Sequence, residues 1–127
     1  MRTNPARPRG RAYDPWEHAD DLGIQVIYRP LRTAHGLWLP DLNTIAVHSR
    51  IRPASQRIVL AHEVGHADLG HRDDRPKHER QADVYAARNL ICPDELEDLY
   101  KWCPDEQRIV SELGVSARLF RAYVASR

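Results

Sequence analysis

Residues 58–70 read IVLAHEVGHADLG and contain the motif H-E-x-x-H at His62, Glu63 and His66. Most of the other residues in this stretch are apolar, which predicts a helix that is buried on most of its faces. On a helix, positions four apart lie on one face, about one turn apart, so both imidazoles can reach one metal ion from the same side. Glu63 follows the first histidine and can act on a water molecule beside that ion. The pattern is typical of zinc peptidases, which use two histidine ligands and a carboxylate general base.

A five-residue motif also occurs by chance, on a surface helix whose histidines and glutamate are simply solvated. The apolar surroundings favour the metal site instead, because buried polar atoms need partners and a metal ion would satisfy all three side chains. Gly65 lowers the stability of a helix by about 1 kcal/mol relative to alanine. Its presence inside the motif is explained if another backbone packs closely against the helix at this point.

A catalytic zinc ion needs a third protein ligand and one open coordination position. The next predicted helix begins near Pro76 and runs to about Ile91. One face of it carries acidic residues followed by small and apolar ones: Glu79, Ala82, Asp83, Ala86 and Leu90. We expect Glu79 to be the third ligand and Asp83 to accept the free ring N–H of one motif histidine. Asp83 is the alternative ligand, and both acids would be solvated if this face were exposed.

The remaining histidines compete less well for a metal ion. His71 lies five residues after His66, just beyond Gly70, and is the first alternative ligand. The other four are expected to be surface residues or hydrogen-bonded core residues, and they are His18, His35, His48 and His78.

Two segments carry a resemblance to a known family. Residues 60–71 read LAHEVGHADLGH and residues 79–91 read ERQADVYAARNLI, and together they resemble the ImmA/IrrE metallo-endopeptidases over roughly residues 24–91. Many members of this family are encoded by bacteriophages and mobile elements. The resemblance implies a zincin-like fold, one zinc ion per chain and cleavage of a repressor protein in the cytoplasm. By position, the metal ligands would be His62, His66 and Glu79, and Glu63 would be the general base.

The expected reaction is hydrolysis of a peptide bond. Glu63 would take a proton from a zinc-activated water as it attacks the peptide carbonyl, and would then deliver that proton to the leaving amine. A further hydrogen-bond donor should stabilise the oxyanion. Tyr85 and His71 are the nearest candidates in the sequence, and Tyr85 also fits a core aromatic. Zinc suits a site of histidine and carboxylate ligands, with manganese or iron as competitors.

Composition agrees with a small intracellular enzyme. The chain has 127 residues, 42% of them hydrophobic, and a net charge of +1, which indicates one domain and no strongly charged partner. Cys92 and Cys103 are too few for a disulfide framework and suggest a reducing compartment. We expect neither a signal peptide nor a membrane span, and therefore a cytoplasmic protein.

The part before the motif predicts a short sheet. Residues 1–12 are rich in arginine and proline and are expected to form a disordered tail, so the folded domain would span residues 13–127. A short helix is expected at residues 15–22, followed by three strands that form a small antiparallel sheet, at residues 24–29, 36–39 and 43–48. Zinc peptidases hold substrate as an extended strand, so the third strand, or its neighbour at Trp38, is expected to line the cleft. Trp38 is otherwise a core residue.

The segment after Pro93 is expected to be a helical cap over residues 93–127, with helices at 93–102, 104–113 and 117–125, the last capped by Ser116. Residues 106–123 also resemble a helix–turn–helix that would present Arg118 and Arg121, so a DNA-binding regulator is an alternative function. A protein that holds zinc and binds a repressor without cutting it is another. The sequence as a whole favours an α+β, zincin-like endopeptidase.

Overall fold

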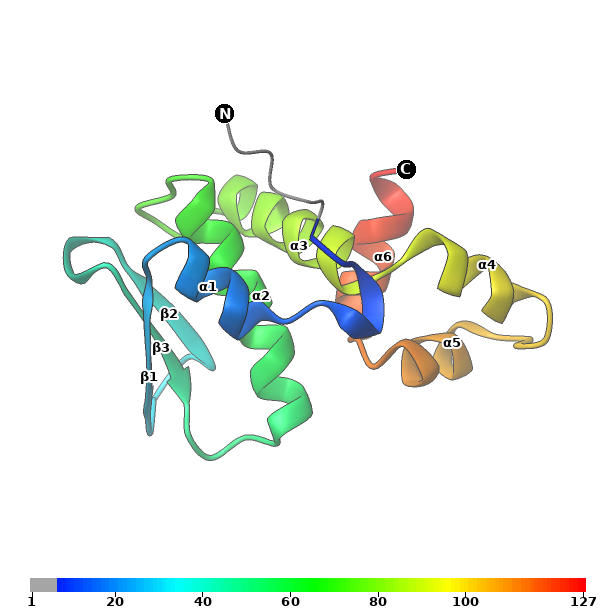
Figure 1. Cartoon of the computed structure of the whole chain (residues 1–127), viewed down its shortest axis with the longest axis horizontal. Helices are drawn as coiled ribbons and strands as arrows, with labels where there is room; N and C mark the ends of the chain where they lie inside the picture. The colour runs from blue at the N-terminus through cyan, green and yellow to red at the C-terminus, as the bar shows by residue number, and fades with distance from the viewer. Residues whose placement is uncertain (1–6) are drawn as a thin grey trace.

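A computed structural model describes residues 7–127 and places a small sheet at one end of the molecule and short helices at the other, with the long helices α2 and α3 between them (Figure 1). The strands are β1 (Gln25–Arg29), β2 (Gly36–Leu39) and β3 (Thr44–His48). The helices are α1 (Pro15–Asp21), α2 (Pro53–Asp68), α3 (Pro76–Leu90), α4 (Pro93–Tyr100), α5 (Glu106–Leu113) and α6 (Ala117–Ala125). The expected α+β class, with the sheet preceding the motif helix, is confirmed.

The sheet is mixed, which corrects the expectation of antiparallel pairing throughout. Within the described residues its strand order is β1–β3–β2; β2 and β3 pair antiparallel, whereas β1 and β3 pair in parallel. Three strands in sequence order would place β2 in the centre. The structure places β3 there, because residues 44–47 are all buried while β1 and β2 each expose part of their length. The most buried strand therefore takes the central position, between the other two.

Helix α2 begins at Pro53, five residues before the helical stretch that the sequence predicts. Residues 60–66 are all buried, as expected for a helix that contacts the sheet and α1 on some faces and α3 on another. The close approach at Gly65 is confirmed, since an added Cβ would lie 3.2 Å from the carbonyl oxygen of Ala82 and 3.1 Å from the Tyr85 ring. Gly65 thus lets α3 pack tightly on the motif helix.

The C-terminal helices form a second apolar core with α3. Helix α6 lies on α3 and buries Leu119, Phe120 and Tyr123. Ser116 caps α6 as expected, accepting a hydrogen bond from the Leu119 amide at 3.1 Å. Helix α5 begins at Glu106, two residues later than predicted, because Asp105 accepts from the Arg108 amide and sets the N-terminus there.

The expected disordered tail is wrong in its last part. Residues 1–6 lie outside the described residues. Gly10–Ala12 form a turn of 3-10 helix in which Gly10 is buried, and the Arg57 guanidinium donates to the Gly10 carbonyl at 2.8 Å. Gly10 has a φ of +73°, and a Cβ there would lie 2.6 Å from a carboxylate oxygen of Glu95. The turn is therefore packed against α4. In the described part of the chain, no helix is long and apolar enough to cross a membrane.

Candidate metal and catalytic site

Helix α2 brings the two motif histidines together inside the molecule. His62 and His66 are 7% and 5% exposed, and their Nε2 atoms lie 3.1 Å apart because the residues are one helical turn from each other. Glu63 is buried next to them, and one ligand atom from each of the three side chains lies within 4.8 Å of the others. The motif therefore gathers two nitrogens and a carboxylate into a group that could hold a metal ion.

A second carboxylate reaches the same point from α3. One oxygen of Glu79 lies 2.6 Å from the Nε2 atom of His66, and its other oxygen lies 3.3 Å from that of His62. Glu79 lies in the first turn of α3, which begins at Pro76, and the Gly65 contact holds this helix close to α2. The three side chains that the sequence predicts as metal ligands thus converge.

The outer ring nitrogens of both histidines have partners of their own. The Nδ1 atom of His62 lies 2.9 Å from an Asp83 carboxylate oxygen. The Nδ1 atom of His66 lies 2.9 Å from the Nδ1 atom of His71, whose Nε2 atom lies 2.9 Å from the side-chain oxygen of Gln81. A carboxylate and an amide oxygen only accept hydrogen bonds, so these neighbours favour the tautomer that carries the N–H group on the outer nitrogen of each ring. The Nε2 atoms of His62 and His66 are then left with lone pairs.

This proton arrangement tests whether a metal ion fits. In that tautomer, two nitrogen lone pairs and the partly exposed Glu79 carboxylate point toward one another without a proton between them. A cation between them satisfies all three. Two imidazoles and one carboxylate are a donor set that zinc accepts, with the remaining position open to water or substrate. The residues present therefore fit a catalytic zinc ion.

The site also shifts the proton affinities of its members. Burial raises the pKa of Glu63 to about 7, with a smaller rise from Glu79, against the opposing effects of His62 and the backbone of Trp38. Burial lowers the pKa of His66, and the neighbouring His62 lowers it further. Burial also opposes protonation of His62, but its hydrogen bond with Asp83 and the charges of Glu63, Asp83 and Glu79 outweigh this and raise its pKa. A carboxyl group whose pKa lies near neutrality can exchange protons during catalysis.

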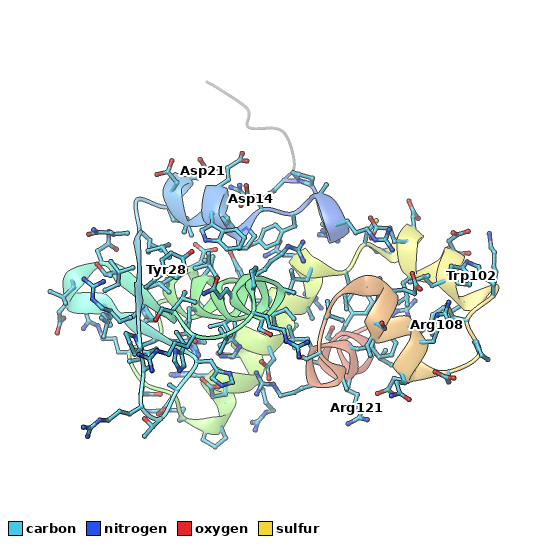
Figure 2. The ribbon with its side chains drawn as sticks, turned by 90° about the horizontal axis from the view of Figure 1, so that it is seen from below. Asp14, Asp21, Tyr28, Trp102, Arg108 and Arg121 are labelled. Atoms are coloured by element: carbon cyan, nitrogen blue, oxygen red, sulfur yellow. The ribbon has the colours of Figure 1, made fainter. Side chains whose placement is uncertain are left out.

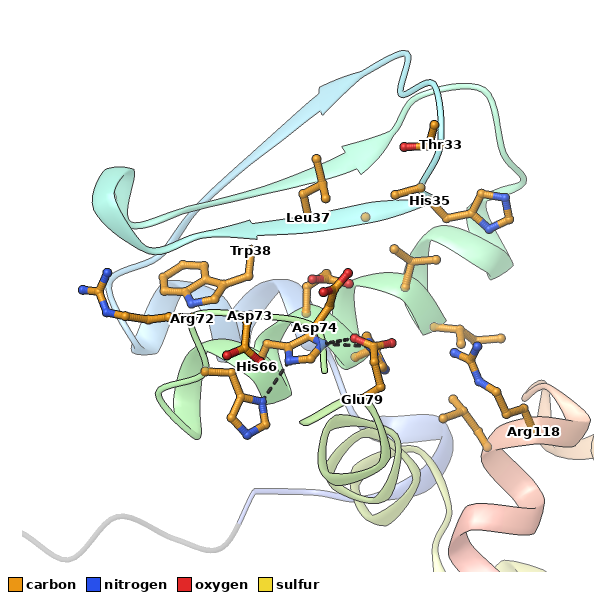
Figure 3. Close-up of a pocket in the computed structure, with 18 residues that line it drawn as sticks. Thr33, His35, Leu37, Trp38, His66, Arg72, Asp73, Asp74, Glu79 and Arg118 are labelled. Atoms are coloured by element: carbon orange, nitrogen blue, oxygen red, sulfur yellow. Dashed lines mark hydrogen bonds and ion pairs between the residues drawn. The ribbon is translucent and has the colours of Figure 1, made fainter. Parts of the chain in front are cut away.

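A cleft of about 660 Å³ opens over these residues. Figure 3 shows β2 along one side, with Leu37 and Trp38, and Glu79 and Arg118 on the opposite side. Gly36 lets β2 approach the motif helix, because a Cβ at this position would lie 2.5 Å from Val59 and 3.0 Å from the Glu63 side chain. Trp38 lines the cleft, which agrees with one of the two alternatives that the sequence left open. The wall of the cleft is formed by β2, not by β3.

Of the two candidates for stabilising the oxyanion, Tyr85 lies outside the cleft and His71 contacts a motif histidine. The hydroxyl of Tyr85 donates to Asp68 at 2.7 Å and lies 3.3 Å from His18, and Tyr85 is not among the cleft residues. The Tyr85 ring packs beside Gly65 and against an apolar cluster, which agrees with the core position that the sequence also allows. His71 does line the cleft, but its Nδ1 atom contacts His66. His71 is the partner of a motif histidine and does not reach the point where the donors converge.

Sequence reasoning missed two residues near the site. Gln81 contacts His71, and Arg118 of α6 lies 3.3 Å from the Asp83 carboxylate at the edge of the cleft. Gln81 follows Glu79 by two residues, so it points to a different side of α3, and no local pattern marks it. The sequence marks Arg118 only as part of a helix–turn–helix. Its approach to Asp83 depends on how α6 packs on α3.

An H-E-x-x-H helix under a short sheet, joined by a carboxylate from the next helix, is the arrangement typical of small metallopeptidase domains. A family model described as the IrrE N-terminal-like domain, of the M78 peptidases, matches residues 19–122, and the chain belongs to this family.

Two relatives share part of this region. The radiation response metalloprotease IrrE of Deinococcus radiodurans is 42% identical over 52 residues, which cover 41% of this chain and 16% of that protein. The protein of the same name from Deinococcus deserti is 38% identical over 52 residues, which cover 41% of this chain and 18% of the relative. The chain therefore matches less than a fifth of the length of either relative.

Proposed function

We propose that this chain is a zinc-dependent endopeptidase in which His62, His66 and Glu79 hold the ion. The observation that carries the proposal is the convergence of two imidazole Nε2 atoms and one carboxylate, whose atoms lie 2.6 to 3.3 Å apart. Membership of a peptidase family supports it. When bound, zinc would polarise the scissile carbonyl and lower the pKa of a nearby water.

Glu63 is the proposed general base. Its carboxyl group is buried beside both histidines, and its pKa of about 7 lets it alternate between the charged and the protonated form. Glu63 takes a proton from the water that attacks the peptide carbonyl. It then returns the proton to the leaving amine when the C–N bond breaks. Asp83 and His71 keep the rings of His62 and His66 in one orientation during this cycle.

The substrate would lie as an extended strand along β2. This strand is at the edge of the sheet, lines the cleft at Gly36, Leu37 and Trp38, and leaves Leu37 43% exposed. An edge strand can hold a peptide by main-chain hydrogen bonds while side chains occupy neighbouring pockets. One peptide bond of a substrate bound in this way would lie over Glu63 and the proposed metal ligands.

We further propose a helix–turn–helix repressor as substrate and the cytoplasm as location. The family resemblance of the two motif segments supports the substrate. Cys92 and Cys103 are free thiols in the described structure, which agrees with a reducing compartment.

The DNA-binding alternative gains no support from the arrangement of α6. This helix buries three of its apolar side chains, and Arg118 is directed to Asp83 at the cleft. Arg121, which projects from α6 in Figure 2, pairs with Glu106 at 3.0 Å. Both arginines that would contact DNA are therefore in ion pairs within the chain.

The test is a Glu63→Gln variant compared with Glu97→Gln on the exposed face of α4. Metal content is measured by mass spectrometry, and cleavage is measured as new N-termini in a mixture of bacterial repressor proteins. We expect wild type and Glu97→Gln to carry about one zinc per chain and to cut, and Glu63→Gln to keep zinc and lose cleavage. Cleavage by Glu63→Gln at the wild-type rate would remove Glu63 as the base. Zinc retained without cleavage in every protein would favour a zinc-holding binding protein.

A further inference from the structure

A second pocket, of about 830 Å³, lies against α3 outside the catalytic cleft. Lys77, Arg80 and Arg88 supply its charge, and Leu69, Val84 and Tyr85 supply its apolar surface. We call these six residues the α3 groove. Positions 77, 80, 84 and 88 fall three or four residues apart, so they share one face of α3.

The charge of the α3 groove is of one sign. All three cations are exposed, and no acidic side chain lines the pocket among residues 7–127. Within the same residues, neither Lys77 nor Arg80 forms an ion pair, and Arg88 donates only to the Ser126 carbonyl, at 3.2 Å. The whole chain has 19 basic and 18 acidic residues, so this concentration of positive charge is local. An anionic partner would find three cations without displacing an acidic neighbour.

The apolar residues of the groove distinguish between anionic partners. Leu69 is 47% exposed at the end of α2, and Val84 and Tyr85 are half-buried beside it. The Tyr85 hydroxyl points away to Asp68, which leaves the ring as the apolar part of the surface. A nucleic-acid backbone would use the cations alone, whereas a peptide with carboxylate and aliphatic side chains would use the cations and the apolar surface.

We propose that the α3 groove binds a segment of another protein that carries acidic side chains next to apolar ones. The proposal is independent of peptidase activity, because the groove lies outside the cleft and includes neither Glu63 nor a proposed metal ligand. The two pockets meet at His71, which lines both of them in the described structure and contacts Gln81 at the groove and His66 at the site. A bound segment would therefore lie against a side chain that orients a metal ligand.

The experiment measures binding of a short fluorescent peptide of glutamate and leucine to the full chain by fluorescence anisotropy at low salt. A peptide with lysine in place of glutamate and a short DNA duplex are the comparison probes. The double variant Lys77→Glu/Arg80→Glu removes two groove cations. The matched control Arg32→Glu/Arg50→Glu makes the same charge change at exposed positions outside both pockets. Circular dichroism establishes that each variant is folded.

We expect the acidic peptide to bind wild type and the Arg32/Arg50 control with equal affinity. Its affinity for the groove variant should be at least about tenfold lower. A Leu69→Ser variant should also weaken it, because the aliphatic side chains lose their contact. Equal loss in the groove variant and its control would show general electrostatic attraction and overturn the proposal. DNA binding with the same dependence on Lys77 and Arg80, or no peptide binding at low salt, would overturn it as well.

Discussion

Two clusters contain buried histidines and differ in how the ring nitrogens are satisfied: one surrounds His18 alone, and the other is the metal cluster of His62 and His66. In the first, the Nδ1 atom of His18 lies 2.8 Å from the Tyr13 hydroxyl and its Nε2 atom lies 3.3 Å from the Tyr85 hydroxyl. In the second, the Nε2 atoms of His62 and His66 face each other and the Glu79 carboxylate, while their outer nitrogens lie close to Asp83 and His71.

Burial does not separate the two clusters, because His18 and His62 are each 7% exposed. The difference lies in the second ring nitrogen. A hydroxyl both donates and accepts, so two tyrosines complete the hydrogen bonding of His18 and make it structural. Two lone pairs and a carboxylate cannot complete one another, which leaves room for a cation.

Replacing Glu79 with alanine should weaken zinc binding by more than about 100-fold, because loss of an outer partner alone costs about 10- to 100-fold and Glu79 is a proposed direct donor. His18→Gln should leave zinc affinity unchanged. Competition with a chromophoric chelator measures both dissociation constants. If the two variants lost affinity equally, the clusters would not differ in the proposed way.

His71→Ala should weaken zinc binding by about 10- to 100-fold, since the Nδ1 atom of His66 loses its partner. The matched control is His78→Ala, because His78 stacks on His71 at 4.0 Å but its Nδ1 atom contacts Asp73 and not the motif. The same chelator titration applies. A loss as large as that of His66→Ala would make His71 a ligand, which is the alternative left open by the sequence.

The second of these clusters shows where sequence reasoning works. The donors of the metal cluster follow local rules, namely the four-residue spacing on one helix and an acidic first turn after Pro76. The bounds of α3 and α6 were likewise predictable, because Pro76 and the Ser116 cap are local signals. The parallel pairing of β1 with β3 could not be predicted in this way, because it depends on which strand takes the centre of the sheet.

Some partners of the histidines could be predicted from local spacing, and others could not. Asp83 follows Glu79 by one turn, so its approach to the motif could be predicted, though not its choice of His62 over His66. Tyr13 and Tyr85 meet His18 from positions 5 and 67 residues away. Arg118 reaches Asp83 only because α6 packs on α3. Contacts of this kind come from tertiary packing and leave no spacing signal in the chain.

The His18 cluster predicts a pH dependence of stability. Burial lowers the pKa of His18 below its ordinary value of about 6.5, so the unfolded chain binds a proton there more readily than the folded one. The stabilising contribution is complete above pH of about 6.5 and is lost as the pH falls toward the folded-state pKa. Urea unfolding above and below that pH measures the free energy of unfolding. This free energy should decrease less at the acidic pH in His18→Gln than in wild type. An equal loss in both proteins would assign the effect to other groups.

Tyr85→Phe should produce the smallest effect. It removes the hydroxyl that donates to Asp68 and contacts His18, which should lower the free energy of unfolding by about 1 kcal/mol. Zinc affinity and the rate of peptide hydrolysis should stay at wild-type values, because the hydroxyl lies outside the cleft. A large drop in turnover with unchanged zinc affinity would restore Tyr85 as an oxyanion donor.

Gly36 has a consequence for recognising active members among related chains. Any other residue at this position would bring a Cβ within 2.5 Å of Val59 and 3.0 Å of Glu63, so either these two side chains or β2 itself would have to shift. A relative that kept both histidines and the glutamate but had a larger residue here would still pass a motif search, and could still load metal. Either shift would move the catalytic carboxylate and a peptide on β2 out of their relative positions. The absence of one side chain, which no motif search examines, would then separate a working enzyme from its metal-binding remnant.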